Sequence, residues 1–194
     1  MQHYQTLALA KYWDELRRGR AVPSRNDIDP GRIRTLLPNV FILEFFDVDH
    51  LVFRLAGTRL CERYGREFRA HNFLSLWRGT DRFRMREFLQ EVLTRPTPGL
   101  ITCRAETIDR HAVDLEMIVL PLRDCSDRVT RVIGSAYPLS DPENLGHRRL
   151  VSQWLLELAY LDPAEFGGDR RSRNGALPQS AASHLRLVVS RQDV

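Results

Sequence analysis

The stretch VFILEFFDVDHLVFRLAGTRLCERYG, residues 40–65, decides the fold of this chain. Apolar residues alternate with other residues on both sides of a turn at residues 47–49, which predicts two antiparallel strands. Thr58 is a suitable N-cap for the following helix, and Gly65 can end that helix in a left-handed conformation. Because a hairpin that leads directly into a helix leaves the sheet incomplete, later strands must complete it. The alternating positions are Phe41, Leu43, Phe45, Leu51, Phe53 and Leu55.

Three further strands are predicted in the second half of the chain, over residues 100–107, 112–122 and 129–137. The turns between them are short, which favours antiparallel neighbours. We therefore predict an α+β fold with a five-stranded antiparallel sheet in the order 2-1-5-4-3. Helices are expected on one face of this sheet, together with an N-terminal and a C-terminal helix.

Apolar periodicity predicts helices over residues 5–18, 80–94 and 145–161. In the first of these, Leu9, Trp13 and Leu16 form an apolar stripe. We interpret the stripe as a homodimer interface formed with the outer face of the sheet, and packing of the helix on its own domain is the alternative.

The chain divides into five expected segments. They are an N-terminal helix and cap segment at 1–38, a core domain at 39–140, a C-terminal helix at 141–162, a flexible linker at 163–183 and a strand-like end at 184–194. The last segment contains HLRLVV, an alternating pattern that suits either its own sheet edge or capture of a partner.

Composition describes an ordinary globular protein of 194 residues, with 43% hydrophobic and 28% charged residues. The net charge is only +4, and arginines are interleaved with acids, which argues against a nucleic-acid-binding surface. The longest apolar runs fall well short of the roughly 20 residues that span a bilayer. With no secretory leader pattern, a cytoplasmic location is expected. The three cysteines, Cys61, Cys103 and Cys125, are widely spaced, which favours reduced structural thiols.

Two short motifs are specific in this chain, DIDP at residues 27–30 and RLAGT at residues 54–58. With the residues around them, over roughly 8–140, they resemble a bacterial family of stand-alone PAS-domain proteins. This resemblance implies a sensory or protein-interaction module in signal transduction, without its own catalytic output. The implied partner is a signalling protein such as a histidine kinase or another regulator.

The same resemblance places small molecules in a cleft between the sheet and the helices. A haem would need an axial histidine on the helix at 80–94, which has none, and a covalent flavin would need a cysteine in a motif that the surroundings of Cys61 do not match. Any cofactor therefore stays unknown. A small apolar ligand would contact Phe53, Leu55, Phe73, Trp77, Phe88 and Met117. The same side chains, as an alternative, simply fill the core.

No metal site and no catalytic set is predicted from the motifs. Asp27 and Asp29 lie at the start of a short helix, where capping explains them better than metal binding. The two functional alternatives that stay open are a small α+β cone enzyme using the same cleft and a basic nucleic-acid-binding regulator.

Overall fold

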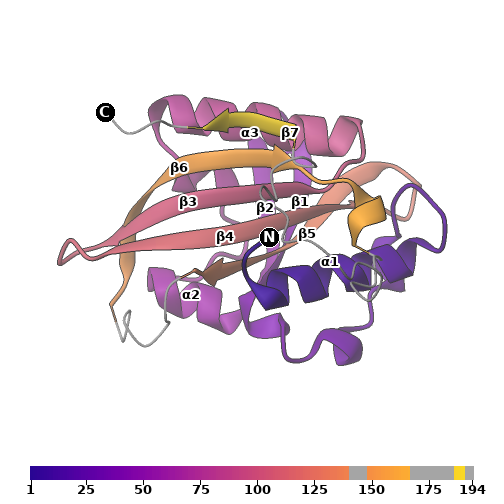
Figure 1. Cartoon of the computed structure of the whole chain (residues 1–194), viewed down its shortest axis with the longest axis horizontal. Coiled ribbons are helices and arrows are strands. Elements are labelled where there is room, and N and C mark those ends of the chain that lie inside the picture. The colour runs from indigo at the N-terminus through magenta and orange to yellow at the C-terminus, as the bar shows by residue number, and fades with distance from the viewer. Residues whose placement is uncertain (140–147, 167–185, 191–194) are drawn as a thin grey trace, which may run out of the picture.

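The computed structural model describes residues 1–139, 148–166 and 186–190. Its described strands form one antiparallel sheet in the order β2-β1-β5-β4-β3-β6-β7 (Figure 1). The strands are β1 (Val40–Asp47), β2 (His50–Ala56), β3 (Gly99–Thr107), β4 (Ala112–Arg123), β5 (Val129–Pro138), β6 (Leu150–Tyr160) and β7 (Arg186–Ser190). The predicted order 2-1-5-4-3 is confirmed for the first five strands. Two further strands extend the sheet beyond β3.

The predicted C-terminal helix at 145–161 is wrong, because residues 150–160 form β6. This strand pairs with β3 over most of its length, from Thr107 opposite Leu150 to Gly99 opposite Tyr160. The register shifts between Leu155 and Glu157, so one residue bulges out of the ladder there. Because a bulge breaks the two-residue alternation of a strand, the apolar spacing in this segment resembles that of a helix.

The C-terminal segment docks on the chain's own sheet in this structure. The backbone of β7 pairs with β6 from Glu157 opposite Ser190 to Tyr160 opposite Arg186. Of the predicted linker, residues 163–165 form the short 3-10 helix η6 (Pro163–Glu165). Phe166, the next residue, is buried against α1, so the first part of the predicted linker is packed on the domain. Residues 167–183 lie outside the described residues.

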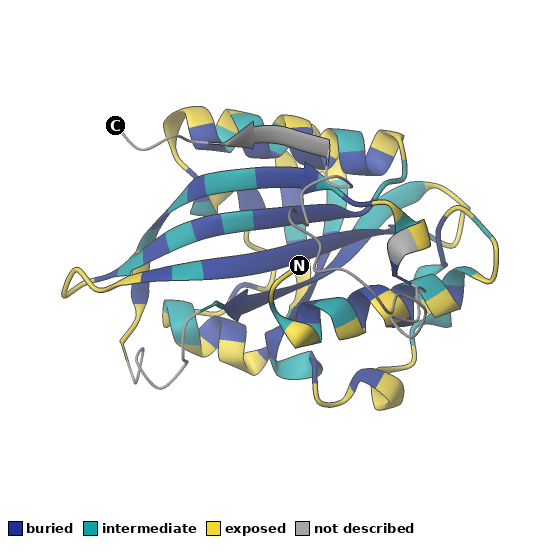
Figure 2. Cartoon of the chain, in the orientation of Figure 1, coloured by how far each residue is buried: buried dark blue, intermediate teal, exposed yellow. Residues whose placement is uncertain are grey.

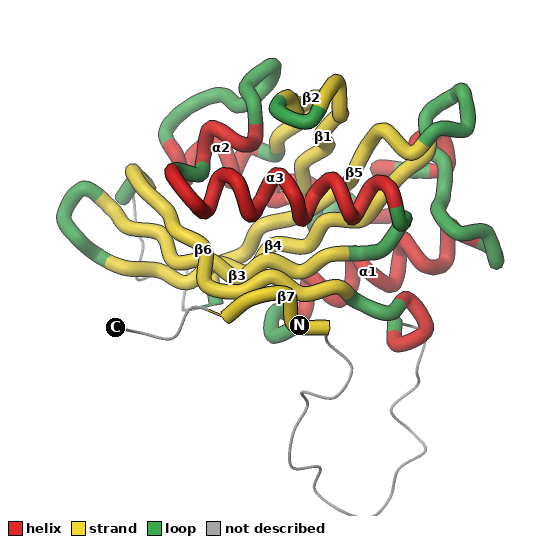
Figure 3. The backbone as a smooth tube through the Cα atoms, turned by 90° about the horizontal axis from the view of Figure 1, so that it is seen from above, coloured by secondary structure: helices red, strands yellow, loops and turns green. Residues whose placement is uncertain are grey.

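The core helices gather on one face of the sheet, as predicted, and the N-terminal helix covers the other face. Figure 3 shows α2 (Thr58–Tyr64) and α3 (Gly79–Thr94) on one side and α1 (Tyr4–Arg17) on the other. The 3-10 helix η4 (Phe73–Leu76) belongs to the same side as α3 and contacts it. We call the side with α2 and α3 the inner face. Two apolar clusters result, and Figure 2 shows buried residues along the central strands and on the sheet-facing sides of the helices.

Helix α1 is packed against β4 and β5 of its own chain. Leu9, Trp13 and Leu16 are all buried there, and Trp13 is only 1% exposed. The indole nitrogen of Trp13 donates a hydrogen bond of 2.8 Å to the carbonyl oxygen of Pro121 in β4. The prediction that these three side chains form a dimer interface is therefore wrong, since burial within the chain leaves them no surface for a partner. An amphipathic stripe shows that one face of a helix is buried, but it does not show whether the same chain or a partner buries it.

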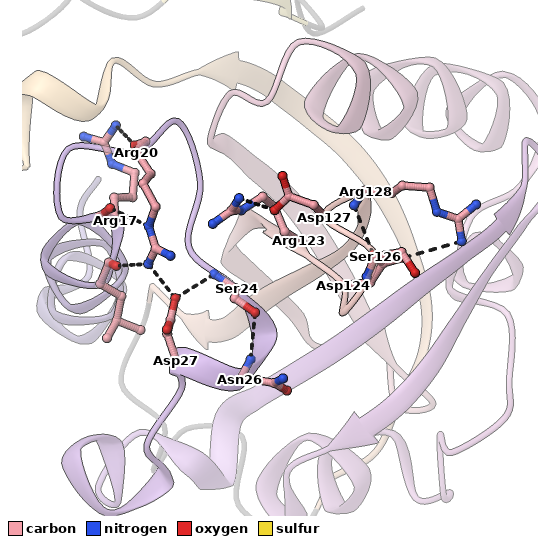
Figure 4. Close-up of polar contacts among 11 residues, drawn as sticks. Arg17, Arg20, Ser24, Asn26, Asp27, Arg123, Asp124, Ser126, Asp127 and Arg128 are labelled. Atoms are coloured by element: carbon pink, nitrogen blue, oxygen red, sulfur yellow. Dashed lines mark hydrogen bonds and ion pairs between the residues drawn. The ribbon is translucent and has the colours of Figure 1, made fainter.

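The residues that carry the family resemblance hold the N-terminal segment against the sheet. Asp27 accepts hydrogen bonds from the backbone nitrogen of Ser24, at 2.9 Å, and from Arg20, at 2.6 Å (Figure 4). Asp29 caps the 3-10 helix η2 (Pro30–Ile33) by accepting from Gly31, at 2.8 Å, as capping predicted. Ser24 also forms a bridge to Arg123 at the end of β4. Two more 3-10 helices flank η2 along the chain, η1 (Arg25–Asp27) before it and η3 (Leu37–Asn39) after it.

The glycine of the RLAGT motif permits a close backbone approach. A Cβ atom at Gly57 would overlap the carbonyl groups of Leu37 and Pro38. Because backbone atoms cannot move aside as a flexible side chain can, the contact between η3 and the start of α2 requires glycine at this position.

Candidate functional site

The cleft predicted for a ligand is occupied by interlocking aromatic side chains. Five of the six predicted contact residues meet on the inner face and are buried: Phe53, Phe73, Trp77, Phe88 and Met117. The ring centres of Phe53 and Phe73 are 5.7 Å apart, and those of Phe73 and Trp77 are 6.2 Å apart. Phe68, which the prediction omitted, lies 4.8 Å from Phe53. These side chains form packed core, and their role toward a ligand stays a prediction.

Leu55 departs from the predicted set because its strand contains a bulge. Leu43 pairs with Phe53 while Ile42 pairs with Leu55, so Arg54 is the extra residue between them. The bulge reverses the direction of the following side chain, and Leu55 is 39% exposed. Leu55 therefore does not join the buried set.

An open groove of about 460 Å³ lies between α3 and β6, at the margin of the packed core. Its walls are formed by Arg84, Glu87, Phe88, Gln90, Glu91, Thr94, Leu158 and Tyr160. The rings of Phe88 and Tyr160 are stacked, with their centres 5.0 Å apart and their planes 22° from parallel. Only Phe88 was among the predicted contacts. Leu158 and Tyr160 were missed because their segment was predicted as a helix, and the polar residues of α3 because the strand opposite them was not predicted.

A polar connection links α3 to β6 beside this groove. The carboxylate of Asp81, which is only 7% exposed, accepts a hydrogen bond of 3.0 Å from the backbone nitrogen of Leu155. Arg84 lies one turn along α3, with its Nη1 atom 3.6 Å from Asp81 Oδ1. The Nε and Nη2 atoms of Arg84 are buried and have no hydrogen-bond partner among the described residues. A buried donor without an acceptor costs about 1–3 kcal/mol, so these two unpaired nitrogen atoms of Arg84 destabilise the folded chain.

The interior thiols are poor nucleophiles. Burial raises the pKa of Cys103, and burial is also the main cause that raises the pKa of Cys61. Because the thiolate is the reactive form, a raised pKa keeps both groups protonated and inert at neutral pH. Their chemistry fits the predicted structural role.

The outer face beyond α1 carries a second surface feature, formed by the β1–β2 hairpin. Phe46, which is 57% exposed, Val48 and Leu55 leave apolar surface open there. Glu44 lies beside them and forms ion pairs with Arg54 and with Arg131, the latter at 2.7 Å. The Arg54 guanidinium also lies 5.0 Å from the ring centre of Phe46. The patch thus combines apolar area with charges of both signs.

The described residues offer neither a metal centre nor a membrane-spanning helix. Across this part of the chain, no three His, Cys, Asp or Glu side chains are grouped in a way that could hold a metal ion. No helix within the same residues has the length and apolarity needed to cross a membrane.

The strand order, with α2 and α3 on the inner face, defines a PAS-like α+β protein. A family model described as a PAS domain matches residues 1–137, and the chain belongs to this family. The comparison with curated proteins gives no match.

Solved structures of light-oxygen-voltage domains are similar to this chain. One, from a study of a flavin analogue in such a domain, has 15% identity and a TM-score of 0.45, and covers 58% of this chain and 85% of its own. The LOV protein of Rhodobacter sphaeroides has 14% identity and a TM-score of 0.44, and covers 61% and 72% respectively.

Proposed function

We propose that this chain is a sensory and protein-interaction module of bacterial signal transduction, acting in the cytoplasm. It passes its output to a signalling protein, such as a histidine kinase or another regulator, and performs no reaction of its own. Membership of the PAS family supports the signalling role. The packed inner face and the protonated thiols favour this function over a cone enzyme, since neither offers a reactive centre.

The observation that carries the interaction role is the strand β7 at the edge of the sheet. Its described pairing is to β6 alone, and it spans only Arg186–Ser190. An edge strand presents backbone N–H and C=O groups to which another strand can add. Recognition by strand addition uses these groups for affinity and alternate side chains for specificity. We therefore assign the β6–β7 edge to the partner.

Homodimer formation is a second part of the proposal, now on a different surface. The exposed side chains of Phe46, Val48 and Leu55 form the patch to which we assign a second copy. Glu44 and Arg54 lie in the same patch, so two copies related by a twofold axis could pair acid with base in both directions. This self-complementarity favours a second copy over an unrelated partner.

A two-hybrid comparison tests the interaction role. The full chain and a chain lacking residues 184–194 are assayed against the histidine kinases and response regulators encoded in the same genome. We expect the full chain to bind at least one of them and the shortened chain to bind none. The deletion should lower stability by a few kcal/mol at most, because a short strand buries little apolar area. Binding by neither protein, or equal binding by both, contradicts the assignment.

A further inference from the structure

The groove between α3 and β6 has walls of three chemical kinds that lie close together. Its apolar part consists of Phe88, Leu158 and Tyr160, with the two rings stacked. Among the described residues the charged lining consists of Arg84, Glu87 and Glu91, and Arg95 forms an ion pair of 3.0 Å with Glu91 from outside the lining. Since α-helical residues three, four and seven apart share one face, these α3 side chains all point toward the same space.

Arg84 presents the strongest sign that an acceptor is missing. Its Nε and Nη2 atoms, which have no partner among the described residues, form the edge of the guanidinium that binds a carboxylate through two parallel hydrogen bonds. The Arg84 side chain keeps 18% exposure and lines the groove, so we expect a small rotation about its bonds to turn this edge into the groove. Asp81 cannot take this place, because its carboxylate lies against Nη1 at 3.6 Å and already accepts from Leu155.

The two glutamates decide between ligand classes. With Arg84 they give the groove lining a net charge of −1. Because Arg95 offsets the charge of Glu91, repulsion of a purely anionic ligand would come mainly from Glu87. A purely cationic ligand would leave Arg84 without its acceptor. A ligand with both charges satisfies both sets of groups, and an apolar substituent would rest on Phe88, Leu158 and Tyr160.

From this lining we infer that the groove binds an amino acid with an apolar side chain. The ligand carboxylate contacts Arg84, and the ammonium group contacts Glu87 beside the Glu91–Arg95 ion pair. The side chain lies on Tyr160, which is half-buried, because Phe88 and Leu158 behind it are almost fully buried. This inference rests on the proposed sensory function and deepens it by naming the class of signal. The backbones of Leu158 and Tyr160 also pair with β7. A ligand on their side chains would therefore contact β6, the strand on which β7 and the proposed partner edge are held.

Calorimetric titration of the full chain with three related compounds tests the inference. L-phenylalanine carries both charges, 3-phenylpropanoate lacks the ammonium group and phenethylamine lacks the carboxylate. We expect saturable binding of L-phenylalanine and at least about tenfold weaker binding of the other two, which corresponds to about 1.4 kcal/mol. L-leucine and L-methionine are titrated as well, in case the groove prefers an aliphatic side chain.

Two variants separate the proposed contact from an effect on folding. Arg84→Met should lose at least about tenfold in affinity while the chain still unfolds cooperatively. Loss of the ion pair with Asp81 lowers the melting temperature, and removal of two unsatisfied buried donors partly offsets this. Arg82→Met, on the same helix but outside the groove lining, should bind as the unaltered chain does. Failure of all three amino acids to saturate at about 10 mM would overturn the inference, as would equal binding by the Arg84→Met variant.

The two-hybrid assay distinguishes this failure from a failure of the proposed function. If the chain binds a kinase or regulator but no amino acid, the signalling role stands and the ligand assignment falls. If it binds an apolar amino acid through Arg84 but none of those proteins, the groove assignment stands and the partner assignment falls.

Discussion

Replacing Trp13 tests whether α1 is part of the folded core or a detachable interaction helix. The indole is 1% exposed, donates to the carbonyl oxygen of Pro121 at 2.8 Å and meets the Phe166 ring edge-on at 6.5 Å. Truncating a buried aromatic side chain costs about 3–5 kcal/mol, and loss of the hydrogen bond contributes about 1 kcal/mol more. Because typical domains unfold with about 5–15 kcal/mol, Trp13→Ala should remove a large part of the total stability.

Urea denaturation followed by far-ultraviolet circular dichroism measures this loss. Trp13→Phe should cost about 1–3 kcal/mol, since it keeps most of the packing but leaves the Pro121 carbonyl unpaired. Tyr4→Ala, at a residue of α1 that is 75% exposed, is the matched control and should change stability by no more than about 0.5 kcal/mol. A Trp13→Ala protein that keeps its unfolding free energy and only changes from dimer to monomer would refute the packing of α1 on its own sheet.

Three further perturbations address the backbone contact, the acid response and the dimer patch. Gly57→Ala should destabilise the fold by several kcal/mol, among the larger effects of single substitutions, because the added Cβ would overlap backbone carbonyls. A thermal melting curve that matches that of the unaltered chain would contradict this. The pKa of Asp27 is lowered, first by the backbone hydrogen bond from Ser24 and then by Arg20. The ionised carboxylate therefore stabilises the fold fully above the usual aspartate pKa near 4, and this stabilisation is lost as pH falls below it. Asp27→Asn should therefore melt with less dependence on pH between about 5 and 2, and an unchanged pH profile would show that Asp27 contributes nothing. Phe46→Glu should convert a dimer to a folded monomer in sedimentation analysis, whereas a dimer that persists places the interface elsewhere.

Much of the sheet could be predicted from sequence because local alternation and short turns specify neighbouring strands. Those two signals specify the neighbours β1–β2, β3–β4 and β4–β5, whereas the pairing of β1 with β5 joins strands far apart in the sequence and agrees with the family resemblance. The errors lie where a single extra residue changes the pattern. One bulge, at Arg54, turned Leu55 outward, and another, between Leu155 and Glu157, gave β6 a helical spacing. A bulge is set by pairing with a distant strand, and the local sequence does not display it.

The candidate site was less predictable for a related reason. Phe53, Phe73 and Trp77 lie on the inner face, where alternation in β2 predicted Phe53 and the aromatic composition of the segment around η4 predicted the other two. Whether such side chains enclose a cavity or fill it depends on how their rings pack in three dimensions. The groove requires β6 as one wall, so Arg84 had no apparent role until that strand was placed against α3.

The packing of α1 against β4 affects how the chain folds during its synthesis on the ribosome. Trp13 and its acceptor in Pro121 are 108 residues apart, so the helix leaves the ribosome long before the strand that receives it. At about 5–20 residues per second, synthesis of the intervening chain takes roughly 5–20 s. Throughout that interval the apolar side of α1 has no docking surface, and exposed apolar segments in unfinished chains are prone to aggregate. We expect the nascent chain to depend on chaperone binding near its N-terminus until β4 has been translated.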